Sequence, residues 1–173
     1  MTSIEQEVQN ERVKVLYQHS NTSLLGLLIL SIAIFYYFWG KVEQALIVVW
    51  FAALLVTITG RIVLFWRFNK ISNTDFSATT WNWFFTEGSV LSATILGSSA
   101  PLFIDFSAPN SAIFLTLVMS GTVAGAMAAL SSFLPAFYLF SLVCLAPLAY
   151  QFYDQGGELY IFSAFIIWFL IMF

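Results

Sequence analysis

Two charged residues of opposite sign are the strongest candidates for chemistry in this chain. Arg61 lies six residues before Arg67 in one apolar run, and Glu87 lies six residues after Trp81 in the next. At 1.5 Å of rise per residue, each would lie about 9 Å inside the membrane boundary. Charges at that depth pair with each other or line a polar cavity. The pair is therefore a candidate for the floor of a ligand pocket or for a switch. The structural alternatives are a salt bridge that only locks two helices, or Arg61 extending alone to the interface.

The run that carries Glu87 is unusually polar for a segment in lipid. Its hydroxyl side chains are those of Ser89, Ser92, Thr94, Ser98 and Ser99. Lipid cannot satisfy such groups, so we expect this helix inside the bundle or against water. Ser92 is a candidate contact for a ligand, together with the aromatic residues Tyr37 and Trp83. For Trp83, as for Trp81, anchoring at the membrane interface is the favoured alternative to lining a pocket.

The sequence carries no pattern that predicts catalysis or a cofactor. It has no HExxH motif, no glycine-rich phosphate loop and no cluster of carboxylates. His19 and Cys144 are the only residues of their types, which argues against bis-histidine haem ligation, a disulfide framework and a multi-cysteine metal site. No lysine lies within an apolar run to anchor retinal, and no basic stretch suits nucleic acid. We expect no enzymatic activity in this segment, no cofactor, no metal and no nucleic-acid partner.

The elements that must position these residues are six apolar runs. Hydrophobic residues make up 60% of the chain and charged residues 9%, which is typical of an all-α integral membrane bundle. The predicted crossings are Ser23 to Trp39, Ala45 to Trp66, Trp81 to Ile104, Ser111 to Leu130, Phe133 to Tyr153, and a sixth from Leu159. Residues 23–173 would form this six-helix domain. Residues 1–22 would form a cytoplasmic amphipathic segment with a surface helix over Ser3 to Tyr17, or a partly ordered tail.

The placement of basic residues predicts the orientation. With the N-terminus inside, five of the six Lys and Arg residues lie at the inner face, namely Arg12, Lys14, Arg61, Arg67 and Lys70. Only Lys41 would lie outside, so the positive-inside rule places both termini in the cytoplasm. The sixth run reaches Phe173 without a polar stop. We expect the chain to continue there into a soluble effector domain.

Small residues at every fourth position predict close helix packing. Gly121, Gly125 and Ala129 form one stripe, and Ser89, Ala93 and Gly97 form another. The stripes would pack on each other, or one would form a dimer face. Pro101 should end or kink its helix, and Pro147 should bend the fifth crossing and free a carbonyl.

Three segments carry a family resemblance: RVKVLYQHSNTSLLG from Arg12 to Gly26, YYFWG from Tyr36 to Gly40, and AGAMAALSSFLPAFYLF from Ala124 to Phe140. With them the chain resembles the six-helix N-terminal membrane sensor regions of bacterial signalling proteins. Such regions precede modules of hybrid histidine kinases, diguanylate cyclases or phosphodiesterases. The general architecture is similar to that of quorum-sensing receptor kinases that detect small hydroxyketones.

The resemblance implies a sensory input domain without activity of its own. A small apolar or amphiphilic signal would bind among the helices, and the sixth helix would relay the change to a dimeric cytoplasmic output domain. The expected partners are the lipid bilayer, the signal and a second copy of the chain. A small transporter or channel-like protein, a membrane scaffold subunit and a membrane enzyme are the alternatives.

Overall fold

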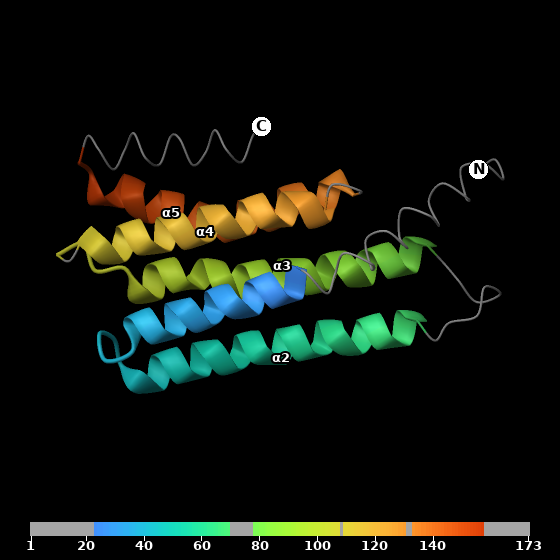
Figure 1. Ribbon diagram of the computed structural model, residues 1–173. Coiled ribbons are helices and arrows are strands. Elements are labelled where there is room, and N and C mark those ends of the chain that lie inside the picture. Colours follow the sequence, from blue (N-terminus) through green and yellow to red (C-terminus); the bar gives the residue numbers. More distant parts are fainter. Residues whose placement is uncertain (1–22, 70–77, 108, 131–132, 158–173) are drawn as a thin grey trace.

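The computed structural model describes residues 23–69, 78–107, 109–130 and 133–157, and this part of the chain is helical without strands (Figure 1). Its helices are Ser23–Phe38, α2 (Gln44–Asn69), α3 (Ala78–Phe103), α4 (Pro109–Leu130) and α5 (Leu134–Gln155). The all-α class is confirmed, and these five helices coincide with the first five predicted runs to within a few residues. The predicted surface helix, His19 and the sixth run lie outside the described residues.

Three of the described helices are long and apolar enough to cross a membrane. These segments are Gln44–Phe68, Asn110–Met127 and Leu134–Gln155. The Ser23–Phe38 helix is apolar but shorter than 18 residues, and α3 is long but carries hydroxyl groups along its length. A membrane character is therefore supported for three segments, whereas six crossings and the side on which the termini lie stay predictions.

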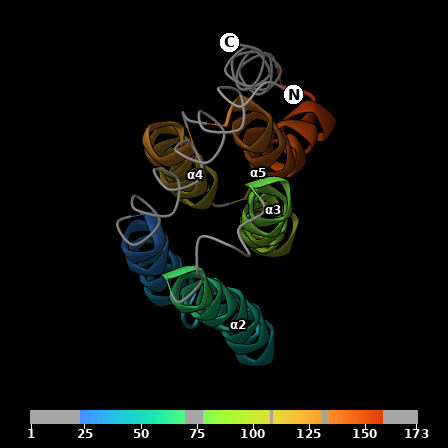
Figure 2. The same cartoon turned by 90° about the vertical axis from the view of Figure 1, so that its right-hand side faces the viewer.

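The helices run roughly side by side, so the bundle has two ends (Figure 1). One end, which we call the Lys41 end, carries the segments Trp39–Glu43 and Ile104–Ser107. The opposite end, which we call the Arg67 end, holds the end of α2 and the beginning of α3. Viewed end-on, α3 lies between α2 and α5 (Figure 2), and it packs against α2, α4 and α5. The most polar helix is thus central.

The most extensive described contact between helices is that of α3 with α5, which run in the same direction (Figure 1). A Cβ atom added at Gly97 would lie 2.7 Å from the carbonyl oxygen of Val143 and 3.1 Å from that of Cys144. Pro147 has no N–H group, so it cannot donate the usual helical bond to the Val143 carbonyl four residues earlier. The carbonyl that Pro147 was predicted to free therefore faces Gly97, and only a residue without a side chain fits there.

Of the two alternatives for the small-residue stripes, packing on each other is not what the described residues show, and a dimer face stays a prediction. Ser89, Ala93 and Gly97 are buried, but Gly97 meets the α5 backbone rather than the glycines of α4. Gly121 and Gly125 are exposed, with nothing within 4 Å of an added Cβ atom at either position. The side chain of Ala129 lies outside the described part. Small residues permit a close approach, but their spacing does not identify the partner helix.

The two prolines differ in their effect on their helices. Pro101 lies in the last turn of α3, which ends at Phe103, so the predicted termination is confirmed. Pro147 lies inside α5, which continues to Gln155 and ends at Gly156 in the left-handed conformation, with φ of 74°.

The segment between α3 and α4 is fixed by hydrogen bonds to Asp105. Its Oδ1 atom accepts bonds from the Ser107 hydroxyl at 2.6 Å and from the Ser107 backbone N–H at 2.9 Å. The Ser111 hydroxyl donates to the Asp105 carbonyl oxygen at 3.0 Å. Because both Ser107 bonds favour the ionised form, the pKa of Asp105 is lowered from its ordinary value of 3.8.

We expect Ser107→Ala to raise the pKa of Asp105 toward 3.8, because the hydroxyl bond is the largest cause of the shift. The contribution of this turn to stability is present above the unfolded pKa and is lost as the pH falls through the lower, folded pKa. Carboxyl NMR titration in detergent would measure the change. Ser107→Thr keeps a hydroxyl and should keep the lowered value; an unchanged titration in Ser107→Ala would contradict the assignment.

Candidate functional site

The buried hydroxyl groups of α3 donate hydrogen bonds to carbonyl oxygens of their own helix. The hydroxyls of Ser89, Ser92 and Ser99 are buried and donate to the carbonyl oxygens of Phe85, Gly88 and Leu96 at 2.9, 2.9 and 2.6 Å respectively. Of the two expected positions for this helix, inside the bundle or against water, the structure shows the first for these serines, although Thr94 is exposed. The Ser92 hydroxyl already donates a hydrogen bond within α3. In this structure it therefore contributes mainly to the hydrogen bonding of its own helix.

Arg61 is buried between α2 and α3, with 8% of its surface exposed. Its guanidinium carbon lies 5.4 Å from the centroid of the Phe85 ring, within the range of a cation–π contact. Its Cγ atom lies 3.1 Å from the position that a Cβ atom would take at Gly88. The glycine therefore provides the space in which the Arg61 stem crosses α3.

Glu87 does not join Arg61 in one buried pair, because its side chain is exposed. It follows Trp83 and precedes Leu91 at intervals of four residues, and both of these side chains are also exposed, at 61% and 52%. Residues at this spacing share one face of a helix. Trp83 and Glu87 therefore lie on an outer face of α3, whereas Arg61 contacts the face of Phe85 and Gly88. Trp83 does not line the region around Arg61.

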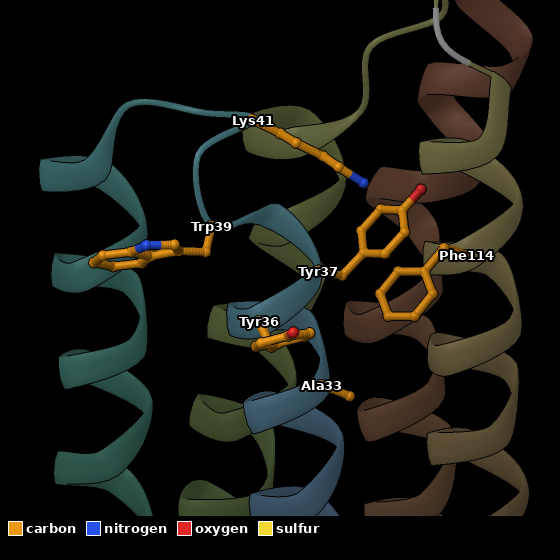
Figure 3. Close-up of a pocket in the computed structure, with 6 residues that line it drawn as sticks. All are labelled: Ala33, Tyr36, Tyr37, Trp39, Lys41 and Phe114. Carbon is orange, nitrogen blue, oxygen red and sulfur yellow. The ribbon is translucent and has the colours of Figure 1, made fainter.

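An aromatic cleft lies at the Lys41 end of the bundle (Figure 3). The Tyr37 and Phe114 rings are stacked, with centroids 4.1 Å apart and planes inclined by 15°. The Lys41 ammonium nitrogen lies 3.4 Å from the centroid of the Tyr37 ring. The Tyr37 ring is thus held between an aromatic ring from α4 and a cation from the loop that follows its own helix.

The cleft has a volume of about 600 Å³, which is within the usual range for small-molecule sites. The described residues of its walls are mostly aromatic, and one of them is charged, namely Lys41. The lining residues are Ala33, Tyr36, Tyr37, Trp39, Lys41 and Phe114. Such a site offers stacking surfaces, an apolar wall and one positive charge, which suits binding rather than bond-making chemistry.

The candidate residues do not come together at one site. Tyr37 lies in the cleft at the Lys41 end, whereas Arg61 and Ser92 lie farther along the bundle. At 1.5 Å per residue, Arg61 is about 25 Å along α2 from Gln44, the first residue of that helix. The sequence therefore identified one residue of the cleft and, separately, a buried arginine that belongs to another region.

Sequence reasoning missed Lys41 and Phe114. Lys41 had a usable signal, because it follows Tyr37 by four residues at the end of a helix. Phe114 had none, since it is one of 19 phenylalanines in the chain and its contact with Tyr37 joins helices far apart in sequence. No known family matches the chain, and no curated protein or solved structure is found to be similar to it.

Proposed function

We propose that this chain is the sensory input domain of a bacterial signal-transduction protein in the inner membrane. It binds a small apolar or amphiphilic signal among its helices. The signal is relayed through the sixth apolar run to a cytoplasmic histidine kinase or cyclic-di-GMP output domain. Both termini lie in the cytoplasm, and the intact protein works as a homodimer. The segment itself catalyses no reaction.

The observation that supports this proposal most directly is the aromatic cleft. Tyr37 and Phe114 bring together the Ser23–Phe38 helix and α4, which are not consecutive in the chain. A molecule bound beside this stack changes the relative stability of the contact between the two helices. Binding that favours one arrangement over another shifts the population of the bundle without any chemistry.

Ring contacts connect the cleft to the centre of the bundle. Tyr37 contacts Phe38 at 4.9 Å, Phe38 contacts Phe103 of α3 at 5.3 Å, and Phe103 contacts Trp50 of α2 at 5.4 Å, measured between centroids. Packed side chains of this kind can carry a rearrangement from a binding site to neighbouring helices. A signal in the cleft would thereby reach α2 and α3.

Arg61 is the proposed switch residue at the α2–α3 contact. Exposure of a charged guanidinium to lipid is costly. Because the Arg61 side chain is instead packed over Phe85 and Gly88, it restricts how α2 and α3 can move. We expect Arg61→Ala to change the basal output or the ligand response of the intact protein by about fivefold, equivalent to about 1 kcal/mol between two states. Glu87→Gln should change it less, because Glu87 is exposed.

Output would be measured as kinase or cyclase activity of the intact protein in membranes, at matched expression. Arg67→Gln is the matched control, because Arg67 is an exposed cation near the end of the same helix. Output and response equal to the parent for both Arg61→Ala and Glu87→Gln would remove both residues from the switch.

Sequencing the gene beyond the codon for Phe173 tests the assignment as a whole. A helical linker that leads into a kinase dimerisation segment or a GGDEF region supports it, and a stop codon contradicts it. In the second case a scaffold subunit becomes the better proposal. The exposed Gly121 and Gly125 face of α4 favours that candidate, since small residues allow another helix to approach closely.

A further inference from the structure

We infer that the aromatic cleft selects a small amphiphile with an oxyanion head group, such as a carboxylate or a phosphate. The inference rests on the proposed function, because it names the chemical class of the signal. It starts from the charge of the site. Among the described residues that line the cleft, Lys41 is the only charged one, and none is acidic. A cationic head group would meet an ammonium of the same sign, whereas an oxyanion would meet a complementary one.

The Lys41 ammonium is positioned to bind an anion. It has three N–H donors, and the face of the Tyr37 ring attracts it without accepting all of them. An oxyanion at the open side of the nitrogen would accept charge-assisted hydrogen bonds, which are stronger than neutral ones. The ring contact and the bound anion can therefore coexist, so the ligand does not have to displace Lys41.

The backbone around Lys41 holds this arrangement in place. Gly40 adopts a φ of 78°, which turns the chain sharply after the Ser23–Phe38 helix. The Lys41 backbone N–H then bonds to the Phe38 carbonyl oxygen at 2.9 Å. Because the turn and the Tyr37 ring already restrict the lysine, less conformational entropy is lost when a ligand binds.

The apolar part of the ligand has a separate surface. Ala33 lies one helical turn before Tyr37, on the side away from the loop that carries Lys41. Phe114 of α4 lies beside Tyr37 (Figure 3). A hydrocarbon chain that extends from a head group at Lys41 toward Ala33 would run along the helix, toward the middle of the bundle. The cleft thus separates a polar end from an apolar wall, as an amphiphile requires.

Photolabelling of the full chain in phosphatidylcholine nanodiscs tests the inference. Three matched ten-carbon probes would carry a diazirine on the chain and a carboxylate, an alcohol or a trimethylammonium head group. Cleft peptides that contain Tyr37 or Phe114 would be quantified by mass spectrometry. We expect saturable labelling by the carboxylate at a concentration about tenfold below that of the alcohol, and the weakest labelling by the cation. Lys41→Gln should abolish the carboxylate preference, and Arg67→Gln should preserve it.

The alternative outcomes are separable. Equal labelling by the three probes, or a carboxylate preference that persists in Lys41→Gln, overturns the selection by charge but leaves the cleft as a binding site and the proposed function intact. Loss of carboxylate labelling when anionic phospholipid is added to the nanodisc identifies a bilayer lipid as the occupant and overturns the inference of a free amphiphile. No saturable labelling by any probe overturns the inference together with the main support for the proposed function.

Discussion

Gly97→Ala is expected to lower the free energy of unfolding by about 2 kcal/mol. The new Cβ atom would lie 2.7 Å from the Val143 carbonyl oxygen, and this atom belongs to the backbone, so it cannot move aside as a flexible side chain could. Overpacking of a close contact costs up to about 3 kcal/mol. The better helix propensity of alanine returns at most about 1 kcal/mol. Thermal or denaturant unfolding in detergent would measure the difference.

Gly121→Ala is the matched control for this substitution. It makes the same chemical change inside a helix, but nothing lies within 4 Å of the new atom. We expect it to be neutral or to stabilise the chain by up to about 1 kcal/mol. If Gly97→Ala and Gly121→Ala unfold alike, the close approach of α3 to α5 is not the contact that holds these helices together.

Trp50→Ala is expected to destabilise the bundle by about 3–5 kcal/mol, the usual cost of removing a large aromatic side chain from a packed interior. Trp50 is 4% exposed, and its ring packs edge-on against Phe103 of α3. Its indole N–H donates to the Ile95 carbonyl oxygen at 2.7 Å. The side chain therefore joins α2 to α3 by a ring contact and by a hydrogen bond, and its removal leaves a cavity between them.

Two variants separate these contributions. Trp50→Phe keeps most of the ring but loses the N–H donor, so it should cost about 1 kcal/mol for the hydrogen bond and a smaller packing loss. Trp66→Ala removes a tryptophan of the same helix that is 65% exposed and should have a much smaller effect in detergent. Equal losses for Trp50→Ala and Trp66→Ala would show that burial does not distinguish the two positions.

The substitutions Trp50→Ala and Gly97→Ala disturb contacts on opposite sides of α3. The packing of both α2 and α5 therefore depends on α3. Trp50 fastens α2 to α3, and Gly97 allows α5 to approach α3 closely. The ring contacts from Tyr37 end on Trp50 through Phe103. If the cleft transmits a signal as proposed, the same contacts that stabilise the bundle also carry it. Variants at Phe103 or Trp50 should then affect stability and response together.

The candidate site was only partly predictable from the sequence. The aromatic residues at the end of the Ser23–Phe38 helix indicated Tyr37 as a candidate. The residues that contact the Tyr37 ring, however, come from a loop and from a helix far along the chain. The charge pattern marked Arg61, yet it also suggested Glu87 as a buried partner. A helix turns by about 100° per residue, so a difference of one position is enough to move Glu87 from the face of Gly88 to the exposed face with Trp83.

The sequence by itself determined the five described helices, their approximate bounds, the end of α3 near Pro101 and the polar character of that helix. These properties depend on local hydrophobicity, backbone chemistry and the unmet hydrogen-bonding groups of one segment. Only the tertiary structure decided that Gly97 faces the Val143 carbonyl, that Gly121 and Gly125 stay exposed, and that Phe114 stacks on Tyr37. Those contacts depend on which faces of the helices pack together. This packing is determined by side chains that are distant in sequence, so no single segment of the sequence specifies it.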